Sequence, residues 1–161
     1  MFSHEEDSYV PGSLRILVTH GPNLNMLGTR EPEIYGSTNL AEIDGLLTSL
    51  AKEAGCELDA FQSNHEGAIV DCIQTEAQDA DGIVINAGAL THYGISLRDA
   101  LADSRLPFIE VHLSNIHARE TFRHHSVVAE LAVGQIAGLG YKGYLYALEF
   151  LVEQIKESRV A

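Results

Sequence analysis

The chain has 161 residues, of which 45% are hydrophobic, and this combination suits one globular domain that buries a full core. Ten basic against 23 acidic residues give a formal charge of −13, which argues against nucleic acid or an anionic membrane surface as a partner. If the substrate is an anion, arginines close to the site must reverse this field.

Cysteine usage and the start of the chain set further limits. Cys56 and Cys72 form neither a CxxC pair nor a His/Cys cluster, so neither a disulfide scaffold nor a structural zinc site is expected. No apolar stretch approaches the roughly 20 residues of a membrane-spanning helix, and the start does not read as a secretion signal. We therefore expect a cytoplasmic protein, with residues 1–13 as a mobile N-terminal extension and residues 14–161 as a single domain.

The hydrophobic pattern alternates between the periods of strands and helices. Strands are predicted at residues 14–19, 58–61, 83–86, 108–111 and 132–137. Helices are predicted at residues 40–54, 69–80, 95–101 and 144–155. Asn39, followed by Glu42, has the spacing of a capping box, and Gly55 ends that helix. The predicted apolar stripes include Leu46 and Ile95. Strands that alternate with helices predict an α/β fold, with a five-stranded parallel sheet and helices on both faces.

A polar run, Gly21–Gly36, directly follows the first predicted strand. Its start predicts a tight turn that places the Asn23 amide close to the strand end. The part from Gly28 to Gly36 carries Arg30 and Tyr35 between two flexible glycines, which is the composition of a loop that can close over a site. Such a loop is more often only solvated, so this run alone does not identify a site.

Polar side chains also end other strands. Asn23 follows the first strand, Asn86 ends the third and His112 ends the fourth. The carboxyl ends of parallel strands meet at one edge, where α/β sheets bind ligands, so these side chains should converge there. Taken singly, Asn86 before Ala87 and Gly88 is equally consistent with an Asx turn.

Glu110 and His112 lie two residues apart on a strand and therefore point to the same face. A carboxylate beside a histidine fixes the ring tautomer, which suits a general acid, although a half-buried ion pair has the same pattern. Arg119 and Arg123 are one helical turn apart and, with Arg30, can form a cationic pocket for a carboxylate. The alternative is a solvated helix with Glu120 as their partner.

Other site chemistries find little support in the sequence. The histidines are numerous, but neither HExxH nor a cysteine pair accompanies them, so no metal is expected. Gly134, Gly138 and Gly140 do not have the GxGxxG spacing, and close packing of strand against helix accounts for them better than phosphate binding. A GxSxG nucleophile elbow is absent from the sequence.

Four linked segments resemble the type II 3-dehydroquinate dehydratases. They are GPNLNMLGTREPEIYG at 21–36, INAGALTHYGISLRDAL at 85–101, EVHLSNIHARETFRHHS at 110–126 and GLGYKGYLYAL at 138–148. The resemblance spans residues 14–152 in the expected order. It implies a flavodoxin-like fold and a hydro-lyase of the shikimate pathway of aromatic amino acid biosynthesis. Such enzymes eliminate water in the anti sense from 3-dehydroquinate, without a cofactor, to give 3-dehydroshikimate.

The resemblance also implies catalytic roles. Tyr35 removes a proton at C2 of the substrate, and His112 protonates the departing C1 hydroxyl while Glu110 steadies its ring. A free phenol ionises only near pH 10, so a phenolate base needs a neighbouring cation, for which Arg30 is the expected source. Asn23 holds a water that stabilises the enolate oxygen.

The implied binding residues surround the rest of the substrate. Asn86 and the backbone amides of Leu113 and Ser114 grip the carboxylate end, while His92 and Arg123 hold ring hydroxyls. Arg119 is expected near the wall of the site.

The resemblance further implies an assembly. Asp99 is expected to reach the site of a neighbouring subunit, because the family forms homododecamers built from trimers. Two departures from the family pattern are His20, where a small polar residue such as asparagine is expected, and Tyr93-Gly94, where small hydroxylic residues are common. The first is expected to perturb the Asn23 turn, and the second to weaken a helix cap or alter the pocket mouth.

Two other hypotheses remain. The other class of dehydratase uses a Schiff-base lysine, but the only lysines, Lys52, Lys142 and Lys156, fall on predicted helices or their ends. A flavodoxin-like binding or assembly module without turnover is the second. The first loop does not have the Ser/Thr-rich grip of a flavin site, nor does it hold the paired acids of a receiver domain.

Overall fold

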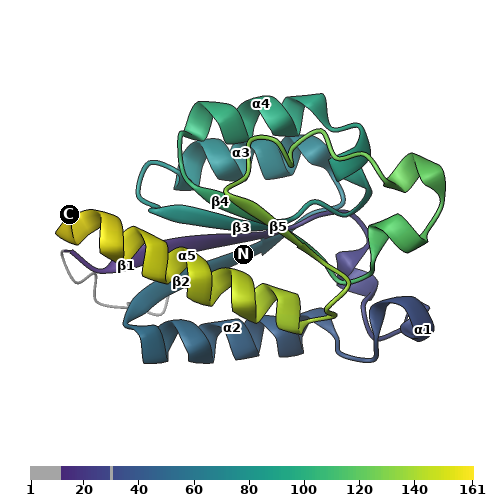
Figure 1. Cartoon of the computed structure of the whole chain (residues 1–161), viewed down its shortest axis with the longest axis horizontal. Coiled ribbons are helices and arrows are strands. Elements are labelled where there is room, and N and C mark those ends of the chain that lie inside the picture. Colours follow the sequence, from purple (N-terminus) through teal and green to yellow (C-terminus); the bar gives the residue numbers. More distant parts are fainter. Residues whose placement is uncertain (1–11, 30) are drawn as a thin grey trace.

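The computed structural model describes residues 12–29 and 31–161, which form a five-stranded, all-parallel sheet in the order β2-β1-β3-β4-β5 (Figure 1). The strands are β1 (Leu14–His20), β2 (Cys56–Gln62), β3 (Gly82–Asn86), β4 (Phe108–His112) and β5 (Gly134–Ala137). This is the flavodoxin-like order, so the predicted fold class is confirmed. The predicted extension at residues 1–13 lies outside the described residues except for Gly12 and Ser13.

Helices cover both faces of the sheet, with α2 and α5 on one face and α3 and α4 on the other (Figure 1). The α-helices are α1 (Pro32–Tyr35), α2 (Leu40–Ala54), α3 (Glu66–Glu76), α4 (Ile95–Ser104) and α5 (Lys142–Val160). The 3-10 turns are η1 (Leu24–Met26), η2 (Gly88–His92), η3 (Ile116–Ala118) and η4 (Thr121–Arg123). In the described part of the chain, none of these helices combines the length and apolar character that a bilayer span requires.

The core is divided by the sheet into two apolar clusters, because successive strand residues point to opposite faces. Ile16 and Val18 of β1 pack into the cluster with α2 and α5, whereas Leu17 between them packs with α3 and α4. In β3 the same alternation directs Val84 to the first cluster and Ile85 to the second. Burial on both sides holds the central strands rigidly and fixes where their ends lie.

The ends of α2 agree with the sequence. The Asn39 side chain accepts a hydrogen bond from the Glu42 amide at 2.9 Å, the Glu42 carboxylate accepts one from the Asn39 amide, and Gly55 ends the helix in the left-handed region. The capping box is therefore confirmed. The prediction for Leu46 was wrong: its side chain is 42% exposed, because the buried stripe runs through Ile43, Leu47 and Ala51.

Other local predictions needed correction. The segment expected as a loop before Gly36 contains the short helix α1. Ile95 is exposed at the first position of α4 and is not part of its apolar face. Gly94, the residue before α4, provides no side-chain cap, as expected from the absence of a hydroxylic residue there, and Glu66 instead accepts a hydrogen bond from the Leu97 amide at 3.0 Å.

Both cysteines are free thiols, and burial makes them poor nucleophiles. Burial raises the pKa of Cys56, and it raises the pKa of Cys72 to about 11. At pH 7.5 the Cys72 thiol is then almost entirely protonated, whereas the thiolate is the reactive form. We expect a thiol-specific disulfide reagent to label the folded protein slowly, and the denatured protein at two sites within minutes. Rapid labelling of both sites in the folded protein would contradict this.

Candidate active site

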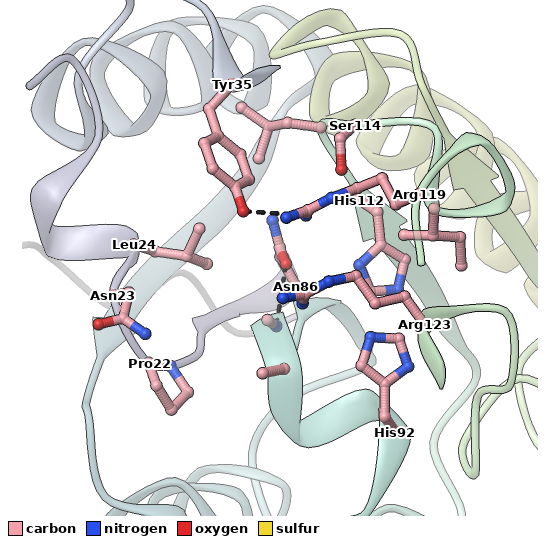
Figure 2. Close-up of a pocket in the computed structure, with 14 residues that line it drawn as sticks. Pro22, Asn23, Leu24, Tyr35, Asn86, His92, His112, Ser114, Arg119 and Arg123 are labelled. Carbon is pink, nitrogen blue, oxygen red and sulfur yellow. Dashed lines mark hydrogen bonds between the residues drawn. The ribbon is translucent and has the colours of Figure 1, made fainter. Parts of the chain in front are cut away.

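A cavity of about 240 Å³ lies at the carboxyl edge of the sheet (Figure 2). Its size suits a small ring compound, because pockets for drug-sized ligands usually span about 300–1,000 Å³. It is lined by Pro22, Asn23, Leu24, Tyr35, Asn86, Gly88, Ala89, His92, His112, Leu113, Ser114, Ile116, Arg119 and Arg123. The lining comes from loops that follow three neighbouring strands, as predicted for a parallel sheet.

Two glycines allow the loops after β1 and β3 to approach each other closely. A Cβ at Gly21 would lie 2.2 Å from the carbonyl oxygen of Ala87, and one at Gly88 would lie 3.0 Å from that of Pro22. Gly88 also has a backbone φ of +57°, which residues other than glycine rarely adopt. The two loops that carry Asn23 and His92 are therefore held together by backbone contact.

Tyr35 and Arg119 meet on one side of the cavity (Figure 2). Nη1 of Arg119 donates a hydrogen bond to the Tyr35 hydroxyl oxygen at 2.9 Å, and the guanidinium carbon lies 5.4 Å from the ring centroid. A guanidinium in this position stabilises negative charge on the phenol oxygen. Arg30, predicted to have this role, lies outside the described residues, so the cation seen beside Tyr35 is Arg119.

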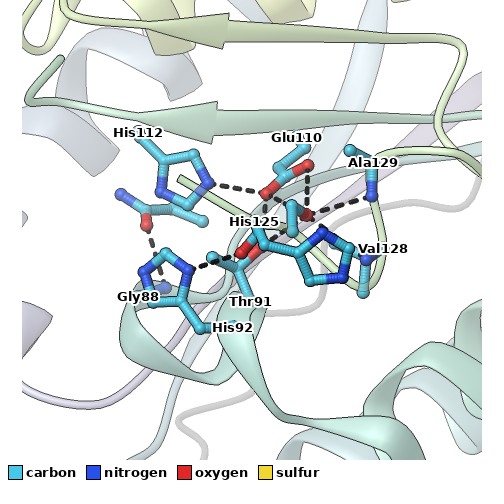
Figure 3. Close-up of polar contacts among 10 residues, drawn as sticks. Gly88, Thr91, His92, Glu110, His112, His125, Val128 and Ala129 are labelled. Carbon is cyan, nitrogen blue, oxygen red and sulfur yellow. Dashed lines mark hydrogen bonds and ion pairs between the residues drawn. The ribbon is translucent and has the colours of Figure 1, made fainter. Parts of the chain in front are cut away.

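His112 and Glu110 form the second polar group, as their spacing predicted (Figure 3). Nε2 of His112 donates to Glu110 Oε1 at 2.6 Å. Because a carboxylate only accepts, this contact fixes the proton on Nε2 and leaves Nδ1 as the ring nitrogen for the cavity that His112 lines.

Two hydroxyl groups complete the environment of Glu110, that of Thr91 (Figure 3) and that of Ser126. The Thr91 hydroxyl donates to Glu110 Oε1, and the Ser126 hydroxyl lies 2.9 and 3.0 Å from the two carboxylate oxygens. Burial alone would raise the pKa of Glu110, but the hydrogen bond and charge of His112, with the Thr91 and Ser126 hydroxyls, outweigh it and lower that pKa. Glu110 is therefore a buried anion behind the imidazole.

Sequence reasoning missed Thr91 and Ser126. Both lie inside segments that resemble the family, and this position in the sequence is the only local indication that either residue contributes to the site. Single hydroxyls have no periodicity, and these two come from segments 35 residues apart that meet only in the folded chain.

His92 lines the cavity opposite Tyr35, next to Arg123 (Figure 2). Its Nδ1 donates to the His125 carbonyl at 2.7 Å, so Nε2 is an acceptor. Burial lowers the pKa of His92, with further lowering from the charges of His112 and Arg123. At neutral pH this ring is therefore a neutral hydrogen-bonding group, which suits contact with a hydroxyl.

Arg119 and Arg123 both line the cavity, but not through one helical face as predicted. Arg119 follows η3, whereas Arg123 lies in η4, where its Nε contacts Glu120 at 2.8 Å. Glu120 also lies 3.8 Å from Arg119, so the alternative partner named from the sequence is present as well. The pocket is nevertheless cationic locally, in a chain with a formal charge of −13.

The remaining predicted site residues fall into three groups. Asn23, Asn86, Leu113 and Ser114 line the cavity, with Asn23 exposed and in a left-handed conformation (φ 69°). Glu110 lies behind His112. Asp99 is exposed on α4 and is not among the lining residues of its own chain.

Neither metal ligation nor Schiff-base chemistry gains support at this edge. The described residues contain no group of three or more His, Cys, Asp or Glu that could hold a metal ion. Among the residues that line the cavity there is no lysine, and Lys156 instead donates to the Ala54 carbonyl at 2.5 Å.

Comparison with known proteins points to one family. The model of the family described as dehydroquinase class II matches residues 14–152. The 3-dehydroquinate dehydratase of Roseiflexus castenholzii is 62% identical over 139 residues, which cover 86% of this chain and 88% of that protein. That of Herpetosiphon aurantiacus is 59% identical, covering 88% and 98%. The crystal structure of the type II dehydroquinase from Propionibacterium acnes superposes with a TM-score of 0.84 at 46% identity, covering 88% and 97%. This chain therefore belongs to the class II dehydroquinase family.

Proposed function

We propose that the cavity catalyses the anti elimination of water from 3-dehydroquinate through an enolate, giving 3-dehydroshikimate without a cofactor. The activity, that of a 3-dehydroquinate dehydratase acting in the shikimate pathway, follows from membership of the family. The observation that best supports the mechanism is that Tyr35 and His112 line one small cavity, each hydrogen-bonded to a partner of the charge it needs.

In this proposal Tyr35 is the base that removes the C2 proton. Its hydroxyl faces a guanidinium 2.9 Å away, which lowers the free energy of the phenolate. The electrons of the C–H bond form the enolate of the C3 ketone. Arg30 is proposed as a further cation at Tyr35, as the family resemblance implies.

His112 is the acid that protonates the C1 hydroxyl as it leaves. This step requires a proton on Nδ1 in addition to the one held on Nε2 by Glu110. The carboxylate stabilises the resulting positive charge, and the C–O bond breaks as the enolate electrons form the new double bond. Water departs, so the atoms and charges of the elimination balance.

The remaining assignments concern binding. Asn86 and the backbone amides of Leu113 and Ser114 are proposed to grip the substrate carboxylate, which suits donors at the end of a strand. His92 and Arg123 are proposed for the ring hydroxyls. A water held by Asn23 is proposed to stabilise the enolate oxygen.

The assembly and location stay proposals from the family resemblance and the sequence. We propose a homododecamer built from trimers, in which Asp99 of one subunit reaches the cavity of a neighbour. Its exposure on α4 is consistent with that role. A cytoplasmic location accords with the sequence.

The test is an assay of the purified protein with 3-dehydroquinate. We expect the ultraviolet absorbance of the conjugated enone to rise, both after treatment with a chelator and after treatment with borohydride in the presence of 3-dehydroquinate, which would reduce any imine between a lysine and the substrate. An inactive protein that still binds 3-dehydroquinate would favour the binding module. Loss of activity with borohydride would point to a Schiff-base lysine instead.

A further inference from the structure

A chain of buried polar side chains runs from α2 to Asn86 in the cavity. His20 is fully buried at the end of β1, with Nδ1 2.8 Å from the Tyr144 hydroxyl and Nε2 2.8 Å from Asp44 Oδ1. Tyr144, also fully buried, comes from α5, and the Asn86 side chain interacts with its hydroxyl. Only Asp44, whose side chain is 32% exposed, reaches solvent.

The sheet brings His20 and Asn86 close together. His20 and Asn86 occupy the same register position on β1 and β3, and α5 packs over that face of the sheet (Figure 1). Tyr144 therefore bridges two neighbouring strand ends. Burial raises the pKa of Tyr144, so its hydroxyl keeps its proton and can donate.

The donors and acceptors of this chain have one consistent direction. A carboxylate only accepts, so Nε2 of His20 donates to Asp44, and in that tautomer Nδ1 accepts from the Tyr144 hydroxyl. The Asn86 side chain stabilises negative charge on the Tyr144 oxygen, and because Nδ2 is the donor of the amide, we assign Nδ2 as the group that faces Tyr144. On its other side, Oδ1 of Asn86 accepts from the Gly88 amide at 3.1 Å.

We propose that His20 and Tyr144 are positioning residues, which hold the Asn86 amide so that its second Nδ2 hydrogen serves the carboxylate of the substrate. This inference rests on the proposed function, because it takes Asn86 as a substrate-binding group. A flipped amide would set its NH₂ against the Gly88 N–H and its oxygen toward the cavity, where it would repel a carboxylate. His20, expected from the sequence to perturb the Asn23 turn, thus has a role toward Asn86.

Tyr144→Phe tests the inference, because it removes one hydroxyl and keeps the ring. We expect KM for 3-dehydroquinate to rise about tenfold, the effect of one hydrogen bond to a charged group, while kcat stays within about threefold. Tyr146→Phe makes the same change on an exposed part of α5 and should leave both constants unchanged.

Two substitutions at His20 separate positioning from a contribution to packing. Asparagine at position 20 has a shorter side chain than histidine but keeps an acceptor for the Tyr144 hydroxyl. Leucine fills more of the space that the histidine ring occupies but has no polar atom. A positioning role predicts a KM close to wild type for His20→Asn and a raised KM for His20→Leu, whichever of the two variants has the lower melting temperature. A purely structural role predicts that KM follows the melting temperature.

The outcomes distinguish the two proposals. A wild-type enzyme that dehydrates 3-dehydroquinate, together with an unchanged KM in both Tyr144→Phe and His20→Leu, would overturn the positioning role and leave the proposed function intact. A wild-type protein without dehydratase activity would overturn both.

Discussion

Tyr35→Phe is expected to lower kcat by roughly 10²- to 10⁴-fold, the usual contribution of general base catalysis, with KM within about threefold. The substitution removes only the hydroxyl oxygen that Arg119 contacts at 2.9 Å, so the ring keeps its packing against the core cluster. Steady-state rates from the enone absorbance measure both constants.

The same assay identifies what the cation contributes. Arg119→Met keeps most of the side-chain length but removes the charge and the donor, and we expect kcat to fall by about 10²-fold, as for other donors to developing negative charge.

Tyr146→Phe is the matched control for Tyr35→Phe, since Tyr146 is 48% exposed and does not line the cavity. Full activity in Tyr35→Phe would show that another group removes the C2 proton.

His112→Ala is expected to lower kcat by a similar factor, roughly 10²- to 10⁴-fold, because the leaving hydroxide would depart without a proton. The exposed His117 on η3 offers the control, and His117→Ala should be close to wild type. If His112→Ala retained the wild-type rate, the acid would have to be sought elsewhere in the lining.

Glu110→Gln probes the group behind the imidazole and should lower kcat by roughly 10²-fold or more. The carboxylate accepts from the His112 ring and from the Thr91 and Ser126 hydroxyls, and a glutamine amide cannot accept from all of them. The ring would lose its fixed orientation and the charge that stabilises its protonated form. A melting curve checks that the variant is folded, since Glu110 is fully buried.

The sequence predicted much of the fold because burial leaves a periodic trace within each element. Apolar runs such as Ile83–Ile85 marked strands buried on both faces, and the period-3.6 stripe through Ile43 and Leu47 marked α2. The failures at Leu46 and Ile95 have the same origin. Hydrophobicity alone cannot say whether a residue at the margin of a stripe faces the sheet or solvent.

Part of the site was also accessible from the residues. Asn86 and His112 were predicted to meet because parallel strands end at one edge, and the pair of Glu110 and His112 followed from their spacing of two. These inferences concern residues that lie on the same strand or at equivalent strand ends. The strand period accounts for the pair on one strand, and the parallel arrangement of the strands accounts for the shared edge.

The sequence by itself determined the alternation of strands and helices, the edge at which the site lies, and a resemblance that named the chemistry. Only the tertiary structure decided that Arg119 lies beside Tyr35, that Thr91 and Ser126 support Glu110, and that His20 and Tyr144 meet behind Asn86. These contacts join residues 84, 16 and 124 positions apart. Contacts of that kind depend on how whole elements pack, and packing leaves no period in the sequence from which they could be read.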